Sequence, residues 1–208
     1  MALELGKKLS KGERINLTKN VDDSGSEKVM NVCVGSNWGA IRKKGFLGMG
    51  SSLESVDLDT SVLCYDVNKT KLDEVSFRKL KNSNGSIYHS GDDREGDLSG
   101  DDGLDNEVIV INLDKVPSSI EYLVLILNSY THQNFSEIPY ARLRVYEGTP
   151  KRVNNVLASY EAEKMNGEAI VLGHFYRKDG WWKFKADGIC SSERSIDEIS
   201  RGTAKDVL

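Results

Sequence analysis

An acidic segment spanning residues 91–107 carries the residue types best able to do chemistry in this chain. It holds eight carboxylates and one base, Arg94, which gives it a net charge of −7. Four glycines spaced through it let the backbone turn and present its carbonyls. Calcium takes about six to eight oxygens, from carboxylates, amides and carbonyls, in flexible geometry. The segment therefore favours a calcium site, and the alternative is a solvated acidic loop that binds no ion.

The segment does not fit the EF-hand, the best-known calcium loop. That loop places glycine at its sixth position and a bidentate glutamate at its twelfth. No register starting at Asp93, Asp97 or Asp101 puts glycine at the sixth position. Zinc and copper are poor candidates because they prefer imidazole or thiolate ligands, and only His89 lies close in the sequence. We expect any calcium site here to use a different scaffold.

A second acidic pair, Asp57 and Asp59, opens an apolar run that ends at Tyr65. Side chains two residues apart on a strand project to the same side. Two carboxylates on one side repel each other unless they share a cation or point into water. The pair therefore predicts a second set of metal ligands, with an exposed strand start as the alternative.

The elements that must position these acids are strands. The acidic segment lies between two strand-like runs, residues 87–89 and 108–113, so it must be a long loop. Period-two alternation places Trp182, Phe184 and Ala186 on one face, and turn signals separate the runs. About ten strands with little helix predict an all-β fold, a β-sandwich of two packed sheets. The other predicted strands are residues 14–18, 29–34, 61–65, 122–127 and 141–146.

One helix is expected, at the C-terminus. Ser195 and Glu198 have the spacing of a capping box, and Ile196 and Ile199 begin an apolar face that continues at Thr203 and Val207. We find no internal repeat and no proline-rich linker. The simplest division is one domain, with a β-sandwich over residues 1–190 and a helical tail over residues 191–208.

Composition narrows the class of protein. The chain has 208 residues and a net charge of −4, so +3 remains outside the acidic segment and no broad basic field exists for nucleic acid. The odd cysteine count and the apolar surroundings of Cys33 and Cys64 favour buried thiols in a reducing compartment. No stretch has the length of a signal peptide core or a membrane span, so we expect a cytoplasmic protein that is not integral to a membrane.

Several motifs, in order over residues 9–190, resemble those of the TerD family of tellurite-resistance and stress proteins. Their order along the chain, rather than any single motif, makes the set specific. The matching segments are residues 9–19, Val34-Gly35-Ser36-Asn37-Trp38, Asp57-Leu58-Asp59-Thr60-Ser61, His89-Ser90-Gly91-Asp92-Asp93, Gln133-Asn134-Phe135, Ala141-Arg142-Leu143-Arg144 and Gly173-His174-Phe175-Tyr176-Arg177 with Trp182-Lys183-Phe184.

The resemblance implies a β-sandwich whose acidic loops bind calcium (Ca2+) at one edge. It also implies a non-catalytic role in resistance to tellurite and other chemical stress. The partners it implies are calcium ions and other tellurite-resistance or stress proteins, at the inner face of the membrane. The ligands carried over are Asp57, Asp59, Asp92, Asp93, Asp101, Asp102, Asp105 and Glu107. Of these, the resemblance favours Asp57, Asp59, Asp92 and Asp102.

The chain also departs from the family pattern. Residues 97–106 form a longer acidic stretch, and Asp93 stands where asparagine is usual. Residues 39–54 are an extra loop, and residues 77–80 replace a polar segment. These differences leave open which acids coordinate and how many ions are bound.

Two other function classes remain as alternatives. Clustered aspartates also hold metals in metal-dependent hydrolases, although the chain has no HxxH motif and no phosphate-binding glycine loop. A calcium-dependent carbohydrate-binding sandwich would use an exposed aromatic such as Trp38, Trp181 or Trp182. The lack of a secretion signal weakens that second alternative.

Overall fold

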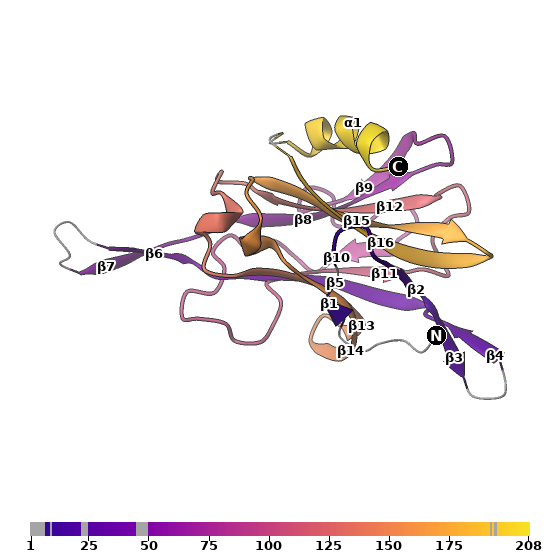
Figure 1. The fold of residues 1–208 in the computed structure, drawn as a ribbon, viewed down its shortest axis with the longest axis horizontal. Coiled ribbons are helices and arrows are strands. Elements are labelled where there is room, and N and C mark those ends of the chain that lie inside the picture. Colours follow the sequence, from indigo (N-terminus) through magenta and orange to yellow (C-terminus); the bar gives the residue numbers. More distant parts are fainter. Residues whose placement is uncertain (1–6, 9, 22–24, 45–49, 192, 194) are drawn as a thin grey trace.

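Two six-stranded β-sheets pack face to face and form most of the protein (Figure 1). The computed structural model describes residues 7–8, 10–21, 25–44, 50–191, 193 and 195–208. Sheet A consists, in spatial order, of β1 (Lys7–Lys8), β14 (Arg152–Glu161), β13 (Ala141–Thr149), β5 (Asn31–Trp38), β11 (Glu107–Asn112) and β10 (Ile87–His89). Sheet B consists of β2 (Arg14–Asn16), β16 (Trp181–Ser191), β15 (Ala169–Lys178), β12 (Tyr122–Ser129), β8 (Leu58–Tyr65) and β9 (Lys71–Val75). The predicted two-sheet sandwich is confirmed.

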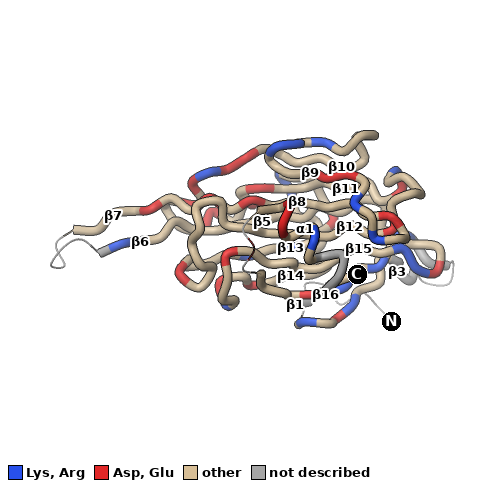
Figure 2. Tube along the Cα trace, turned by 90° about the horizontal axis from the view of Figure 1, so that it is seen from above, with Lys and Arg blue, Asp and Glu red and all other residues tan. Residues whose placement is uncertain are grey.

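Two hairpins extend from the sheets. β3 (Thr18–Val21) pairs with β4 (Gly25–Lys28), and β6 (Ile41–Lys44) pairs with β7 (Ser51–Glu54). The second hairpin projects well away from the sandwich (Figures 1 and 2). This second hairpin occupies the predicted extra loop, and residues 45–49 of that loop lie outside the described part of the chain. Residues 23 and 24, in the turn expected between β3 and β4, also lie outside it.

The core lies between the sheets and follows the predicted alternation. Trp182, Phe184 and Ala186 on β16 are fully buried, while Lys183 and Lys185 between them keep partial exposure. β12 is buried on both faces, since Leu125 packs in the main core and its neighbour Val124 packs on the outer side of sheet B. A strand buried on both sides has a continuous apolar run, which is why it was predictable.

The C-terminal helix α1 (Ile196–Asp206) covers part of the outer face of sheet B (Figure 1). The predicted capping box is confirmed: Glu198 N–H donates to Ser195 Oγ, and Ser195 N–H donates to Glu198 Oε2, each at 3.2 Å. Ile196 and Ile199 pack against Tyr65 and neighbouring residues of the sheet. The helix therefore completes the second apolar layer rather than forming a separate unit.

Cys33 and Cys64 are buried, as expected from their apolar neighbours, whereas Cys190 is exposed. Within the described residues, no helix is both long enough and apolar enough to cross a membrane. Two short 3-10 turns, Phe135–Glu137 and Ala162–Lys164, connect strands near the end of the sandwich where the acidic loop lies.

Candidate metal centre

Three carboxylates from two distant segments meet at one end of the sandwich. Asp57 immediately precedes β8, Asp59 lies in β8, and Asp92 lies in the loop that follows β10. One oxygen from each lies within 4.8 Å of the other two. Asp57 and Asp59 are buried, and Asp92 is more exposed. Asp57 and Asp59 therefore lie close together, as their predicted projection to one side of the strand requires, and Asp92 is the third member of the group. We call these three residues the acidic triad.

A fourth carboxylate, Glu107, supports the triad from sheet A. It begins β11 and is fully buried. Its Oε2 accepts a hydrogen bond from Thr60 N–H at 2.8 Å, which ties the start of β11 to β8. His89 Nε2 lies 3.3 Å from the same oxygen. Glu107 thus places a third buried carboxylate beside Asp57 and Asp59, while its Oε2 also links the two sheets.

The triad is electrostatically costly without a cation. Burial, followed by repulsion from Asp92 and Glu107, raises the pKa of Asp57 to about 6. Burial, followed by Glu107 and Asp57, raises the pKa of Asp59 to about 7. Burial removes water from around the carboxylate and the neighbouring carboxylates repel its charge, so both causes disfavour the ionised form. A bound divalent cation would offset both effects.

The free oxygen atoms at the site fit a hard cation. Asp57 Oδ1 and Asn128 Oδ1 are both buried, and neither has a hydrogen-bond partner among the described residues. Asn128, on β12, sits beside Asp59 and donates from Nδ2 to its Oδ2 at 3.3 Å. Buried polar atoms are normally paired, so unpaired oxygens beside a triad of carboxylates are suited to coordinate a cation. An oxygen-only donor set suits calcium or magnesium better than zinc or copper.

Hydrogen bonds to β5 hold the acidic loop in place. Trp38 Nε1 donates to Val56 O at 2.7 Å, and Trp38 N–H donates to Asn106 Oδ1 at 2.8 Å. Asn37 Nδ2 donates to Asp97 Oδ2 and to Leu104 O, at 3.1 and 2.7 Å. The end of β5 therefore fixes both the segment before Asp57 and the loop that carries Asp92.

The remaining predicted ligands lie apart from the triad or have other partners. Asp93 Oδ1 accepts from the N–H groups of Glu95 and Gly96, which shapes a turn. Asp101 pairs with Arg142 at 2.6 Å, and Asp105 pairs with Arg144 at 2.8 Å, both on β13. Burial raises the pKa of Asp105, although the Arg144 guanidinium opposes the shift. Asp102 is exposed and accepts from Leu104 N–H.

Comparison with known proteins places this chain in a family. The family model described as TerD domain matches residues 5–199. The chain belongs to the TerD family. It is 33% identical to tellurium resistance protein TerZ of Serratia marcescens, over 92% of this chain and 93% of TerZ. It is 32% identical to stress response protein SCP2 of Bacillus subtilis (strain 168), over 92% of this chain and 96% of SCP2.

Solved structures show the same architecture. A homologue of telluride resistance protein (TerD) from Streptomyces coelicolor A3(2) superposes with a TM-score of 0.64 at 18% identity. The superposition covers 82% of this chain and 97% of that one. The family model and the relatives confirm the resemblance of the sequence motifs to the TerD family, and this superposition confirms the sandwich fold that the resemblance implied.

Sequence reasoning missed several residues that build this candidate site. Asn128 was hidden because its place beside Asp59 depends on the pairing of β12 with β8. Asp97 was not singled out among the loop acids, although Tyr140 Oη donates to it at 2.7 Å. Trp38 belongs to one of the motifs that resemble the family, but its hydrogen bonds to Val56 and Asn106 could not be predicted from the neighbouring sequence. Such contacts join residues far apart in sequence, so spacing alone could not reveal them.

Gly96→Ala is expected to loosen the acidic loop of this TerD domain. Gly96 has φ +67°, and a Cβ there would lie 2.5 Å from Trp38 Cδ1. We expect a loss of about 1–2 kcal/mol of unfolding free energy, measured in urea, from backbone strain plus displacement of the loop. Gly100→Ala is the matched control because φ is +101° but nothing lies within 4 Å of its Cβ. Equal losses in both variants would show that contact with Trp38 does not matter.

Proposed function

We propose that this chain binds calcium at the acidic triad and acts as a non-catalytic interaction module in tellurite resistance or a related chemical stress response. The observation that carries the proposal is the convergence of three carboxylate oxygens within 4.8 Å. Asp57 and Asp59 are the principal ligands, Asp92 closes the site, and Asn128 supplies an amide oxygen. The ion would supply the positive charge that the buried carboxylates lack.

Two features of the site support calcium over a purely structural acidic cluster. Asp57 Oδ1 has no hydrogen-bond partner among the described residues, which leaves an oxygen available for coordination. The pKa values of Asp57 and Asp59 are raised to about 6 and about 7, so ionising both without a cation costs stability. Flexible loops with several carboxylates suit calcium, which tolerates irregular geometry better than magnesium does.

An ordered acidic edge suits interaction with a partner protein. The loop at residues 91–106 is exposed over much of its length and joins the triad to the outer surface. An ion bound at Asp92 would order this loop, so a partner that contacts the ordered loop would bind in a calcium-dependent way. Other tellurite-resistance and stress proteins, at the inner face of the membrane, are the partners we propose for a cytoplasmic protein of this kind.

The names of the relatives support a resistance role over catalysis. They describe tellurium resistance and stress response and indicate no catalytic activity. A metal-dependent hydrolase needs a metal with an open position and a group that activates water. His89, the histidine nearest the triad in sequence, points its Nε2 at Glu107 and accepts from Gly91 N–H at Nδ1. Nδ1 is thus bonded to the backbone, which favours a structural role, whereas Nε2 lies beside the Glu107 carboxylate without a hydrogen bond among the described residues.

Calorimetric titration of chelator-treated protein with calcium chloride tests the proposal. We expect a dissociation constant of about micromolar or lower, as in calcium-sensing sites. The Asp57→Asn/Asp92→Asn variant removes two triad charges, and we expect at least about a tenfold loss of affinity. A parallel titration with magnesium chloride shows whether the site selects the larger ion.

The matched control is Asp101→Asn/Asp102→Asn, which makes the same charge change in the same loop. Both residues are exposed, and Asp101 is paired with Arg142 rather than directed at the triad. Affinity close to that of the unmodified protein is therefore expected. Equal losses of calcium affinity in the two double variants would mean that the general negative charge of the loop attracts the ion. No heat of binding with the unmodified protein would refute the calcium site.

A further inference from the structure

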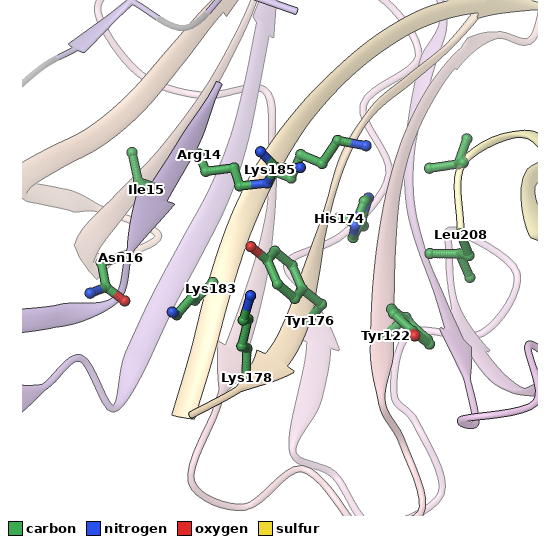
Figure 3. A pocket seen from close by; sticks show the side chains of 11 residues that line it. Arg14, Ile15, Asn16, Tyr122, His174, Tyr176, Lys178, Lys183, Lys185 and Leu208 are labelled. Atoms are coloured by element: carbon green, nitrogen blue, oxygen red, sulfur yellow. The ribbon is translucent and has the colours of Figure 1, made fainter. Parts of the chain in front are cut away.

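A groove of about 790 Å³ lies on the outer face of sheet B, where α1 does not cover the strands (Figure 3). It is at the opposite end of β12 from the acidic triad: Tyr122 begins the strand at the groove, and Asn128 lies beside Asp59. Six residues of extended strand separate the two positions by about 20 Å. The groove is thus separate from the proposed metal site.

Strand pairing brings basic side chains together in this groove. Lys185 on β16 is the cross-strand partner of Arg14 on β2 and of His174 on β15. In the next row, Lys183 pairs with Asn16 and Tyr176. Like charges directly opposite each other destabilise a sheet, so the Arg14–Lys185 pair costs stability unless an anion neutralises it.

Acidic neighbours neutralise part of this positive charge. Asp187 is buried and bonds both His174 Nδ1 and Lys185 Nζ, at 2.5 and 2.9 Å. Asp179, which is largely exposed, pairs with Lys183 at 2.6 Å. No hydrogen bond or ion pair joins the side chain of Arg14 or Lys178 to another residue in the described part of the chain. Two cations of the groove therefore remain available to a bound anion.

Aromatic and apolar side chains line the other side of the groove. The rings of His174 and Tyr176 lie 5.5 Å apart, and those of Tyr122 and His174 lie 6.3 Å apart. Leu208, at the end of the chain that follows α1, flanks Tyr122 (Figure 3). The groove therefore has cationic side chains on β2, on β16 and at the end of β15, where Lys178 lies, and aromatic side chains on β12 and β15. A volume of this size matches pockets that hold small organic ligands, which span about 300–1,000 Å³.

We propose that this groove binds a small phosphate ester. Arginine and lysine form short, charge-assisted hydrogen bonds with phosphate oxygens, and Arg14 and Lys178 are available for them. The tyrosine rings offer a surface for an aromatic or apolar group attached to the phosphate. The ligand chemistry is thus an oxyanion joined to an apolar part, which a free nucleotide or a phospholipid headgroup would both supply.

Calorimetric titration with sodium AMP, after dialysis to remove divalent cations, tests the proposal. We expect binding that weakens at least about tenfold in Arg14→Gln/Lys178→Gln, because two charge-assisted hydrogen bonds are lost. These two side chains have no ion pair or hydrogen bond to lose among the described residues. The variant should therefore fold, with a stability that is unchanged or raised by relief of the Arg14–Lys185 repulsion, and the thermal unfolding curve checks this. Arg42→Gln/Lys43→Gln on β6 makes the same charge change outside the groove and should bind AMP as the unmodified protein does.

Two further probes separate the sources of the phosphate. Inorganic phosphate should bind more weakly than AMP because it cannot use the aromatic side chains. Co-sedimentation with phosphatidylcholine vesicles, with and without phosphatidic acid, tests the lipid source. Binding to phosphatidic acid alone, lost in the groove variant, would identify a membrane phosphate as the ligand. No binding of AMP, phosphate or these vesicles, or equal binding in the groove variant, would overturn the proposal.

Discussion

Asp59→Asn is expected to stabilise the calcium-free protein at about pH 8 and to remove most of the stabilisation that calcium adds. Asp59 is almost fully buried, and burial together with Glu107 and Asp57 raises its pKa to about 7. At about pH 8 the carboxylate is ionised in a place that disfavours the charge. The amide has nearly the same shape and no charge. We expect a gain on the order of 3 kcal/mol in the free energy of unfolding.

The sign of the pH dependence follows from the raised pKa values. A carboxyl group whose folded pKa lies above its ordinary value binds its proton more tightly in the folded state. The free energy of unfolding that this tighter proton binding contributes is fully present below about pH 4. It is lost as the pH rises through about 6 for Asp57 and about 7 for Asp59. The calcium-free protein should therefore become less stable over this window, and Asp59→Asn should flatten the profile.

Urea unfolding at several pH values, with a chelator or with calcium, measures both effects. Calcium at about a hundredfold excess over its dissociation constant should add about 2.7 kcal/mol to the unmodified protein and little to the variant. Asp102→Asn changes the same charge at an exposed position and should shift stability by no more than about 0.5 kcal/mol. A variant less stable than the unmodified protein at about pH 8 without calcium would contradict the argument.

The fold was predictable because its central strands carry strong local signals. The continuous apolar run at residues 122–127 became β12, which is buried on both faces. The alternation around Trp182 became β16. β14 was not predicted, because its residues Arg152–Glu161 do not alternate cleanly and two register shifts interrupt its pairing with β13. A strand stabilised mainly by its neighbours leaves a weak pattern in its own sequence.

The candidate site was predictable in composition but not in detail. Period two was enough to place Asp57 and Asp59 together, and they do meet. The acidic loop offers six further candidates, of which the resemblance favours Asp92 and Asp102. Asp92 joins the triad, whereas Asp102 is exposed and lies outside it. Asp105 instead lies against Gly35, where a Cβ would collide with its carboxylate, and pairs with Arg144. Which acids converge depends on contacts between the loop and β5 or β13, and these contacts join segments that are distant in sequence.

Trp38 connects the core of the sandwich to the proposed metal site. Its ring is fully buried and its Nε1 donates to Val56 O, directly before Asp57. Its backbone N–H and C=O bond Asn106 and Asp97 of the acidic loop. One residue therefore positions both segments that supply the acidic triad.

Trp38→Phe is accordingly expected to weaken calcium binding as well as stability. Phenylalanine leaves Val56 O buried without its donor and a small cavity beside Gly96, at a cost of about 1–3 kcal/mol in unfolding free energy. The freed Val56 segment lets Asp57 move, so we expect calcium affinity to fall by about tenfold, or 1.4 kcal/mol. Urea unfolding and calcium calorimetry on the same preparation measure the two losses.

Trp182→Phe is the matched control for this prediction. Trp182 is also fully buried, and its Nε1 donates to Leu113 O at 3.0 Å, on the side of the core away from the triad. The same substitution there should cost a similar amount of stability, since it removes the same donor from a buried carbonyl. Calcium affinity should stay unchanged, because neither Asp57 nor the acidic loop depends on Trp182. If both variants lost affinity equally, the loss would reflect general destabilisation, and Trp38 would have no specific part in positioning the site.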